Sequence, residues 1–196
     1  MDEISRYAVG LDVGTSNVRA VVASIAGNGN LNVIGYAEAP TNSGMRRGVV
    51  ANLSGPAQAI DQMLGEVERM SGYEVNSATV SINGAHILST QTKGMIAVGG
   101  MEHEINMDDL ARVEDQALRG WIPANQQILE TVPLQFMLDG QGGIKDPLGM
   151  TGSRLEMQAN VVSALAPNYE NLKRVAEAAN VTPEQVIPSA QAAARA

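Results

Sequence analysis

The stretch GLDVGTSNVRAVV, residues 10–22, decides how this sequence of 196 residues is interpreted. Two apolar segments, 7–11 and 18–25, have the composition of β-strands, and a Gly-Thr-Ser-Asn turn separates them. A strand that only fills a core needs neither an aspartate nor a cluster of small polar residues. A turn of this kind can present backbone N–H groups to a phosphate. The alternative is a plain hairpin turn in which Asp12 is hydrogen-bonded locally.

Strand-like and helix-like segments alternate along the rest of the chain. A second turn at 27–30 leads into a strand at 31–37, so the first three strands form an antiparallel meander. Apolar residues recur at helical spacing over 53–70, where Asn52 or Ser54 serves as the N-cap and Gly72 ends the helix. Further strands are expected at 75–82, 87–92, 95–98, 127–133, 134–138, 154–165 and 186–188, helices at 107–119, 168–179 and after 188, and a loop at 141–147. This order of elements indicates an α/β or α+β protein.

The composition limits the classes of function. Apolar residues make up 44% of the chain and charged residues 17%, so a folded core is expected rather than disorder. The formal net charge of −8 disfavours nonspecific binding to nucleic acids and to anionic membranes. The chain has no cysteine, which excludes disulfides and cysteine-ligated zinc and suits the cytoplasm. The acidic N-terminus is not a secretory signal, and no apolar run reaches the roughly 18–20 residues that span a bilayer.

Four stretches of the sequence resemble a known family. The segment at 10–22 resembles the first phosphate hairpin of the actin and sugar-kinase superfamily. GMRRGVVANL at 44–53, SINGAHILST at 81–90 and KDPLGMTGSRLEMQANVV at 145–162 resemble the FtsA family of bacterial cell-division proteins, in the same order and at similar spacing. The resemblance implies an α/β fold, namely an actin-like half domain of the ribonuclease-H type that carries an inserted α+β subdomain 1C of the SHS2 kind. Subdomain 1A is then expected at 1–78 and 161–196, and subdomain 1C at 79–160.

The resemblance covers only part of an FtsA protein. Full-length members have four subdomains, 1A, 1C, 2A and 2B, and then a tail with an amphipathic membrane helix. This sequence resembles 1A and 1C, and it contains no second glycine-rich hairpin, no adenosine motif and no terminal amphipathic helix. We therefore expect a piece of a longer protein or a shortened relative.

The resemblance implies a nucleotide site with ATP and Mg²⁺ in the full-length family. Two hairpins, one from each lobe, enclose the nucleotide phosphates in the superfamily, and this chain has the first. Asp12 would hold Mg²⁺ through water, and Arg19 stands where actin has a lysine. With the second lobe missing, ATP binding by this chain is expected to be weak or undetectable. The residues expected to bind the cofactor are Asp12, Gly14, Thr15, Ser16, Asn17 and Arg19.

The function implied by the resemblance is that of an actin-like scaffold rather than an enzyme, because the family binds ATP with at most weak hydrolysis. FtsA proteins tether FtsZ filaments to the cytoplasmic face of the inner membrane at the division site and recruit later division proteins. Self-association through 1A and 1C, and recruitment through 1C, would remain in this cytoplasmic chain, with a contact surface near 95–104 and 141–149. Contacts with FtsZ and the membrane lie in the missing parts, and no nucleic acid is expected as a partner.

Two other functions and several single residues remain open as alternatives. A pilus-assembly relative of the same fold would bind a short peptide, and a sugar-kinase-like fragment would share the first hairpin. His86 is expected to be structural, whereas His103 between Glu102 and Glu104 is either a surface residue or a metal ligand. The other candidates are Asp108 and Asp109 as helix-capping residues, Arg46 and Arg47 as an anion contact or solvated surface, and Trp121 as an interface anchor or core residue.

Overall fold

The computed structural model describes residues 6–100 and 103–196, which divide into two compact units. The first unit comprises the chain up to Ile87 together with Leu165–Ala196, and the second is Leu88–Ala164. The chain thus leaves the first unit, builds the second and returns, as an inserted subdomain requires. The expected subdomain limits of 78/79 and 160/161 fall nine and four residues before these divisions and stay a prediction.

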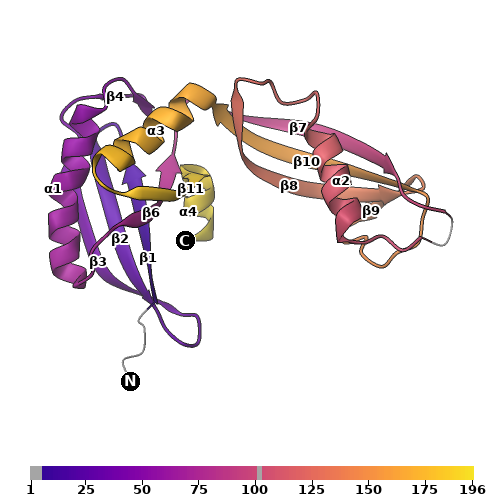
Figure 1. Cartoon of the computed structure of the whole chain (residues 1–196), viewed down its shortest axis with the longest axis horizontal. Helices are drawn as coiled ribbons and strands as arrows, with labels where there is room; N and C mark the ends of the chain where they lie inside the picture. The colour runs from indigo at the N-terminus through magenta and orange to yellow at the C-terminus, as the bar shows by residue number, and fades with distance from the viewer. Residues whose placement is uncertain (1–5, 101–102) are drawn as a thin grey trace. The chain divides into compact units, whose positions relative to one another are not determined.

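The first unit is built on a five-stranded mixed sheet with the order β11-β6-β1-β2-β3 (Figure 1). The predicted meander is present as β1 (Arg6–Val13), β2 (Asn17–Ile25) and β3 (Leu31–Pro40), each antiparallel to the next. Strand β6 (Ser77–Ile82) runs parallel to β1 and to β11 (Thr182–Pro188). The sheet therefore combines an antiparallel half with a parallel half.

Helix α1 (Ser54–Ser71) packs on β2 and β3 and also contacts α3 (Ala166–Ala178). The side chains of Val18, Ala20 and Val22 alternate with exposed ones along β2 and are buried, as are Ile60 and Met63 of the helix. Gly72 ends α1 with φ of 77°, as the sequence predicted, because glycine adopts the left-handed conformation readily. The short hairpin of β4 (Met45–Arg46) and β5 (Val49–Val50) precedes α1, and α4 (Ser189–Arg195) follows β11.

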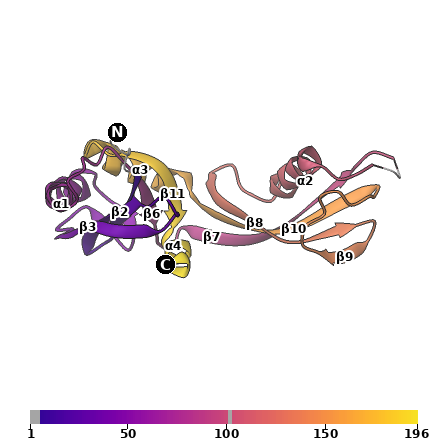
Figure 2. The same ribbon diagram turned by 90° about the horizontal axis from the view of Figure 1, so that it is seen from below.

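The second unit is an antiparallel four-stranded sheet with the order β7-β10-β8-β9, covered on one face by α2 (Met107–Leu118) (Figure 2). Its strands are β7 (Ile87–Ala97), β10 (Arg154–Leu165), β8 (Gln126–Leu138) and β9 (Gln141–Ile144). Helix and sheet are very close at Gly94, where an added Cβ would lie 2.5 Å from the backbone nitrogen of Ala117. The buried core consists of Ile96, Val98, Ile105, Val113, Ala117, Phe136, Leu138, Leu155, Met157 and Ala159.

Three predictions for this second unit are wrong. The segments 87–92 and 95–98 form one strand, because Gly94 does not break β7 but makes room for α2. The segments 127–133 and 134–138 also form one strand, and the predicted loop at 141–147 contains β9. Pro133 is tolerated inside β8 because β9 pairs only with the end of that strand, at Phe136 and Leu138.

The fold class predicted from the sequence is confirmed: an actin-like α/β half domain carries an inserted antiparallel SHS2 sheet. None of the helices in the described ranges is long and apolar enough to cross a membrane.

Candidate functional site

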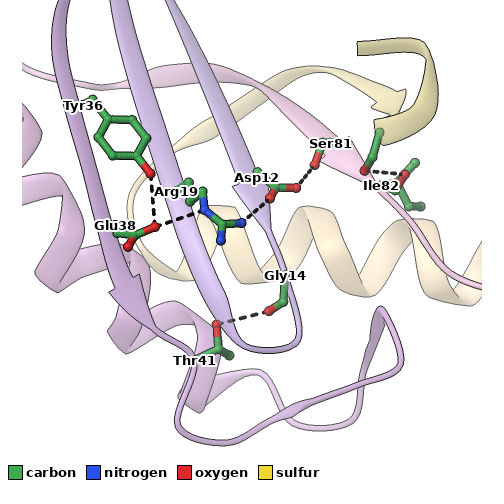
Figure 3. A network of polar contacts seen from close by, with 9 residues as sticks. Asp12, Gly14, Arg19, Tyr36, Glu38, Thr41, Ser81 and Ile82 are labelled. Atoms are coloured by element: carbon green, nitrogen blue, oxygen red, sulfur yellow. Dashed lines mark hydrogen bonds and ion pairs between the residues drawn. The ribbon is translucent and has the colours of Figure 1, made fainter. Parts of the chain in front are cut away.

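The turn between β1 and β2 is held from two sides, and its backbone geometry is fixed by hydrogen bonds. The N–H of Gly14 donates to the carbonyl of Asn17 at 3.0 Å, which closes the turn. Thr41, just after β3, donates from its N–H to the carbonyl of Ser16 at 2.7 Å and from its hydroxyl to the carbonyl of Gly14 at 3.1 Å (Figure 3). The carbonyl oxygens of Gly14, Ser16 and Asn17 therefore accept hydrogen bonds from protein donors.

The N–H groups at the tip of the same turn have no such partners. Thr15 and Ser16 are exposed, and neither backbone N–H donates a hydrogen bond to any acceptor in the part of the chain that the structure describes. The hydroxyl oxygen of Thr15 accepts a bond from the N–H of Gly48 at 2.9 Å, so the β4–β5 hairpin lies against the turn. Two successive free N–H groups on a fixed turn can bind an anion.

Beside the turn, charged side chains form a row across the outer face of the sheet. Asp12, Arg19 and Glu38 lie directly opposite one another on β1, β2 and β3. Arg19 contacts Asp12 at 3.4 Å and Glu38 at 3.1 Å, and the hydroxyl of Tyr36 donates to Glu38 at 3.0 Å. The hydroxyl of Ser81 on β6 donates to the other oxygen of Asp12 (Figure 3).

Arg19 is the positive charge in the middle of this row. Its hydrogen bond to Glu38, helped by the charges of Glu38 and Asp12, raises the pKa of Arg19 against the lowering effect of burial. Arg19 therefore stays charged and screens both carboxylates. The row carries a net charge of about −1 when Asp12 and Glu38 are ionised, because two acids share one base.

The residues fit a phosphate better than a metal ion alone. Asp12 offers one carboxylate, and that group already accepts bonds from Ser81 and Arg19. Among residues 6–100 and 103–196, no group of three or more His, Asp or Glu side chains is placed to share a metal ion. Mg²⁺ keeps several of its waters and is commonly held by one or two carboxylates plus substrate phosphates. Asp12 therefore fits an outer-sphere role for Mg²⁺ that arrives with a phosphate.

A mainly apolar pocket of about 240 Å³ opens next to Asp12. Its lining residues come from β1, β2, β3, β6, β11 and α4. The hydroxyl of Ser189 fixes the start of α4 by donating to the carbonyl of Ile82 at 3.1 Å. The pocket is lined by Gly10, Leu11, Asp12, Arg19, Ala20, Val21, Tyr36, Thr79, Ser81, Ile187 and Ala192.

The second unit contains a separate polar cluster around Asp109, whose predicted helix-capping role is confirmed. Asp109 is 2% exposed and accepts from the backbone N–H of Asn106, while the Asn106 side chain accepts from Asp109 in return. His103 contacts one oxygen of Asp109 at 2.8 Å, and Arg112 contacts the other at 2.9 Å. Burial alone would raise the pKa of Asp109, but the bonds from His103 and Asn106 and the charges of His103 and Arg112 hold it below the usual value.

The sequence analysis also named His86, Trp121 and Glu102. His86 is 8% exposed, its ring nitrogens have no hydrogen-bond partner within the described ranges, and burial lowers its pKa, which agrees with the predicted structural role. Trp121 is half exposed, and its role as an interface anchor stays a prediction. Glu102, which the sequence placed beside His103, lies outside the described residues.

Sequence reasoning found part of this site and missed the rest. Gly14, Thr15, Ser16 and Asn17 make the turn, and the structure brings Asp12 and Arg19 together beside it. Their binding of a nucleotide stays a prediction. The partners Glu38, Thr41, Gly48 and Ser81 were not identified, because each comes from another strand or loop and no local pattern marks it.

Comparison with known proteins shows that both units of the chain are similar to FtsA proteins. Residues 84–163 match the family model described as the SHS2 domain inserted in FTSA. The chain is 35% identical over 182 residues to the cell division protein FtsA of Pseudomonas aeruginosa, covering 93% of this chain and 43% of that protein. The chain is an FtsA-like N-terminal region. The FtsA of Bacillus subtilis is 32% identical over 173 residues, covering 88% of this chain and 39% of that protein.

The FtsA-like chain spans less than half of the length of the curated relatives that it matches. A solved structure titled "PilM-PilN type IV pilus biogenesis complex" matches 92% of this chain and 47% of the other chain, with a TM-score of 0.61. At 18% sequence identity, this match shows that the fold is shared and nothing more.

Proposed function

We propose that this FtsA-like chain serves bacterial cell division as part of an actin-like scaffold. The observation that carries the proposal is the 35% identity over 182 residues to an FtsA, which runs through both units. In the complete protein, such a scaffold would tether FtsZ filaments to the cytoplasmic face of the membrane at the division site and recruit later division proteins. Contacts with FtsZ and the membrane belong to regions that this sequence does not resemble.

The first unit is proposed to provide one side of the ATP site. The free N–H groups of Thr15 and Ser16 support this, because they are the donors that a phosphate requires. Asn17 and Gly14 fix the turn, and Asp12 would orient the waters of Mg²⁺ carried in by the nucleotide. Mg-ATP would supply the phosphates and the metal charge, and the chain's own residues would only bind and orient them. Hydrolysis and phosphoryl transfer to sugars are not expected from this half site.

The second unit is proposed to carry the protein contacts, both to further copies and to later division proteins. Several large apolar side chains stand exposed near its predicted contact segments. The N–H of Ile105 donates to the carbonyl of Met150 at 2.9 Å, so the loop before α2 and the loop before β10 lie together. Exposed methionines adapt to different partner surfaces because their side chains are flexible. The exposed apolar residues in this region are Met95, Met107, Leu148 and Met150.

A chimera tests the cell-division proposal. The segment of the Pseudomonas aeruginosa FtsA that aligns with this chain is replaced by residues 1–196, and the chimera is expressed while the host FtsA is depleted. We expect cells to keep dividing at normal length. Long undivided filaments, despite stable expression of the chimera and rescue by the unaltered FtsA, would contradict the proposal.

The pilus-assembly function is the second candidate, supported by the fold likeness alone. It predicts binding of a short assembly peptide from a pilus system. A pull-down with the chain of 196 residues alone distinguishes the two candidates: under our proposal the pilus peptide is not retained, whereas its retention would favour the alternative.

A further inference from the structure

Two adjacent arginines occupy the tip of the β4–β5 hairpin. Arg46 pairs with Val49 across the hairpin, which leaves Arg47 and Gly48 as the two central turn residues. Both have positive φ angles, 51° for Arg47 and 77° for Gly48, which is the pattern of a type I′ turn. Asparagine or aspartate normally fills the first of these positions, because a longer side chain is strained there. An arginine is therefore an unfavourable choice for the turn itself.

The hairpin is fixed in place next to the phosphate turn. The N–H of Gly48 donates to the Thr15 hydroxyl at 2.9 Å, and an added Cβ on Gly48 would lie 2.7 Å from the carbonyl oxygen of Asn83. At the base of the hairpin, the carbonyl of Gly44 accepts from the N–H of Ala51 at 2.8 Å. Arg47 precedes Gly48 in the chain, and their Cα atoms are about 3.8 Å apart. Arg47 is therefore the direct neighbour of the residue that contacts Thr15.

Both guanidinium groups are free to bind a ligand. Arg46 and Arg47 are exposed, and neither side chain forms an ion pair or hydrogen bond within residues 6–100 and 103–196. Arg19, in contrast, is occupied by Glu38 and Asp12. In a chain with a net charge of −8, two unpaired cations beside two free N–H groups form a local anion-attracting surface.

We propose that Arg46 and Arg47 supply the cationic half of a polyphosphate site whose N–H half is the Thr15–Ser16 turn. This inference rests on the proposed phosphate-binding role of that turn and deepens it. The free N–H groups favour phosphate over the carboxylates of an acidic protein segment, because a tetrahedral phosphate can accept from the turn and from a guanidinium at once. A role in binding then explains why a residue that is unfavourable for the turn itself occupies position 47.

The test is a titration of the ¹⁵N-labelled chain with inorganic tripolyphosphate, monitored by the amide signals of Thr15 and Ser16. Arg46→Gln removes one charge, and Arg47→Asn removes the other while inserting the residue that the turn prefers. Arg69→Gln, at the far end of α1, is the matched control for charge. We expect Arg46→Gln and Arg47→Asn each to weaken binding about fivefold, as for an exposed ion pair, and Arg69→Gln to leave it unchanged. Arg47→Asn should also raise the melting temperature, since it relieves the strain.

The outcomes distinguish a failure of the arginine site from a failure of the proposed phosphate-binding turn. If Thr15 and Ser16 respond but Arg46→Gln and Arg47→Asn bind like Arg69→Gln, the arginine site is wrong and the phosphate turn stands. If neither amide responds to millimolar tripolyphosphate, the turn and the arginine site are both wrong. Citrate that shifts the same amides with equal affinity would overturn phosphate as the ligand class and point to an acidic protein segment.

Discussion

Replacing Asp109 with asparagine should destabilise the second unit strongly while leaving its shape intact. The carboxylate is 2% exposed and holds three groups at once: the backbone N–H of Asn106, His103 and Arg112. An asparagine keeps one acceptor oxygen and places an NH₂ group where the second oxygen accepted bonds. One buried donor is then left unsatisfied, which costs about 1–3 kcal/mol, and a charge-assisted bond to a half-exposed partner is lost, which costs about 1 kcal/mol. We expect a total loss of about 2–4 kcal/mol in the free energy of unfolding.

The single tryptophan makes this loss measurable in the intact chain. Trp121 lies in the second unit, whereas all four tyrosines lie in the first. Urea unfolding followed by Trp121 fluorescence therefore reports on the unit that contains Asp109. At an m-value of about 1 kcal/mol/M for so small a unit, the midpoint should fall by about 2–4 M. Asp115→Asn is the matched control, because Asp115 lies on the same helix but forms only an exposed pair with Arg119.

The pH dependence of the same residue provides a second readout. The pKa of Asp109 is lower in the folded state than in the unfolded chain, so its stabilisation is complete above the unfolded value of about 3.9 and is lost as the pH falls through the folded value. Asp109→Asn should remove this acid-dependent part of the unfolding free energy. Equal midpoints for Asp109→Asn and Asp115→Asn at pH 7 would refute the account of the buried cluster.

Three further predictions concern glycine packing, the hairpin contact and a buried histidine. Gly94→Ala should destabilise the second unit by about 1–3 kcal/mol, read from the tryptophan midpoint, because the new Cβ clashes with the backbone of Ala117; an unchanged midpoint would contradict this. Thr15→Val should cost the first unit about 1 kcal/mol in tyrosine-monitored unfolding, since it removes the acceptor for the Gly48 N–H. The imidazole of His86 should titrate below about 6.5 by NMR, so the first unit should lose stability as the pH falls through that value; a pKa above it would contradict the burial.

The sequence predicted those elements whose local signals agree with the tertiary structure. The first meander, α1 with Gly72 and the long strand β10 follow from apolar periodicity and turn residues. The errors arise where a breaker residue serves a tertiary contact instead. Gly94 continues β7 because α2 needs the space, and Pro133 continues β8 because β9 pairs only with the end of that strand, at Phe136 and Leu138.

Strand β9 and the residues that contact Asp12 and Thr15 were missed by the sequence analysis for two different reasons. Asp139 and Gly140 both have positive φ, and an Asp-Gly pair directly after a strand is a hairpin signal that predicts β9. The contacts of Ser81 with Asp12 and of Gly48 with Thr15 join residues more than thirty positions apart. No local pattern encodes such contacts, so the complete site required the structure.

The most direct test of the central claim is a comparison of Mg-ATP affinity in two proteins by isothermal titration. The first is this chain of 196 residues, and the second is the chimera that adds the remaining lobe of the Pseudomonas aeruginosa FtsA. Each charged or backbone contact to a phosphate contributes on the order of 1.5–3 kcal/mol, so losing one side of the site should reduce affinity by orders of magnitude. The account predicts no binding by the isolated chain below millimolar ATP and micromolar binding by the chimera. Micromolar binding by the isolated chain would contradict it.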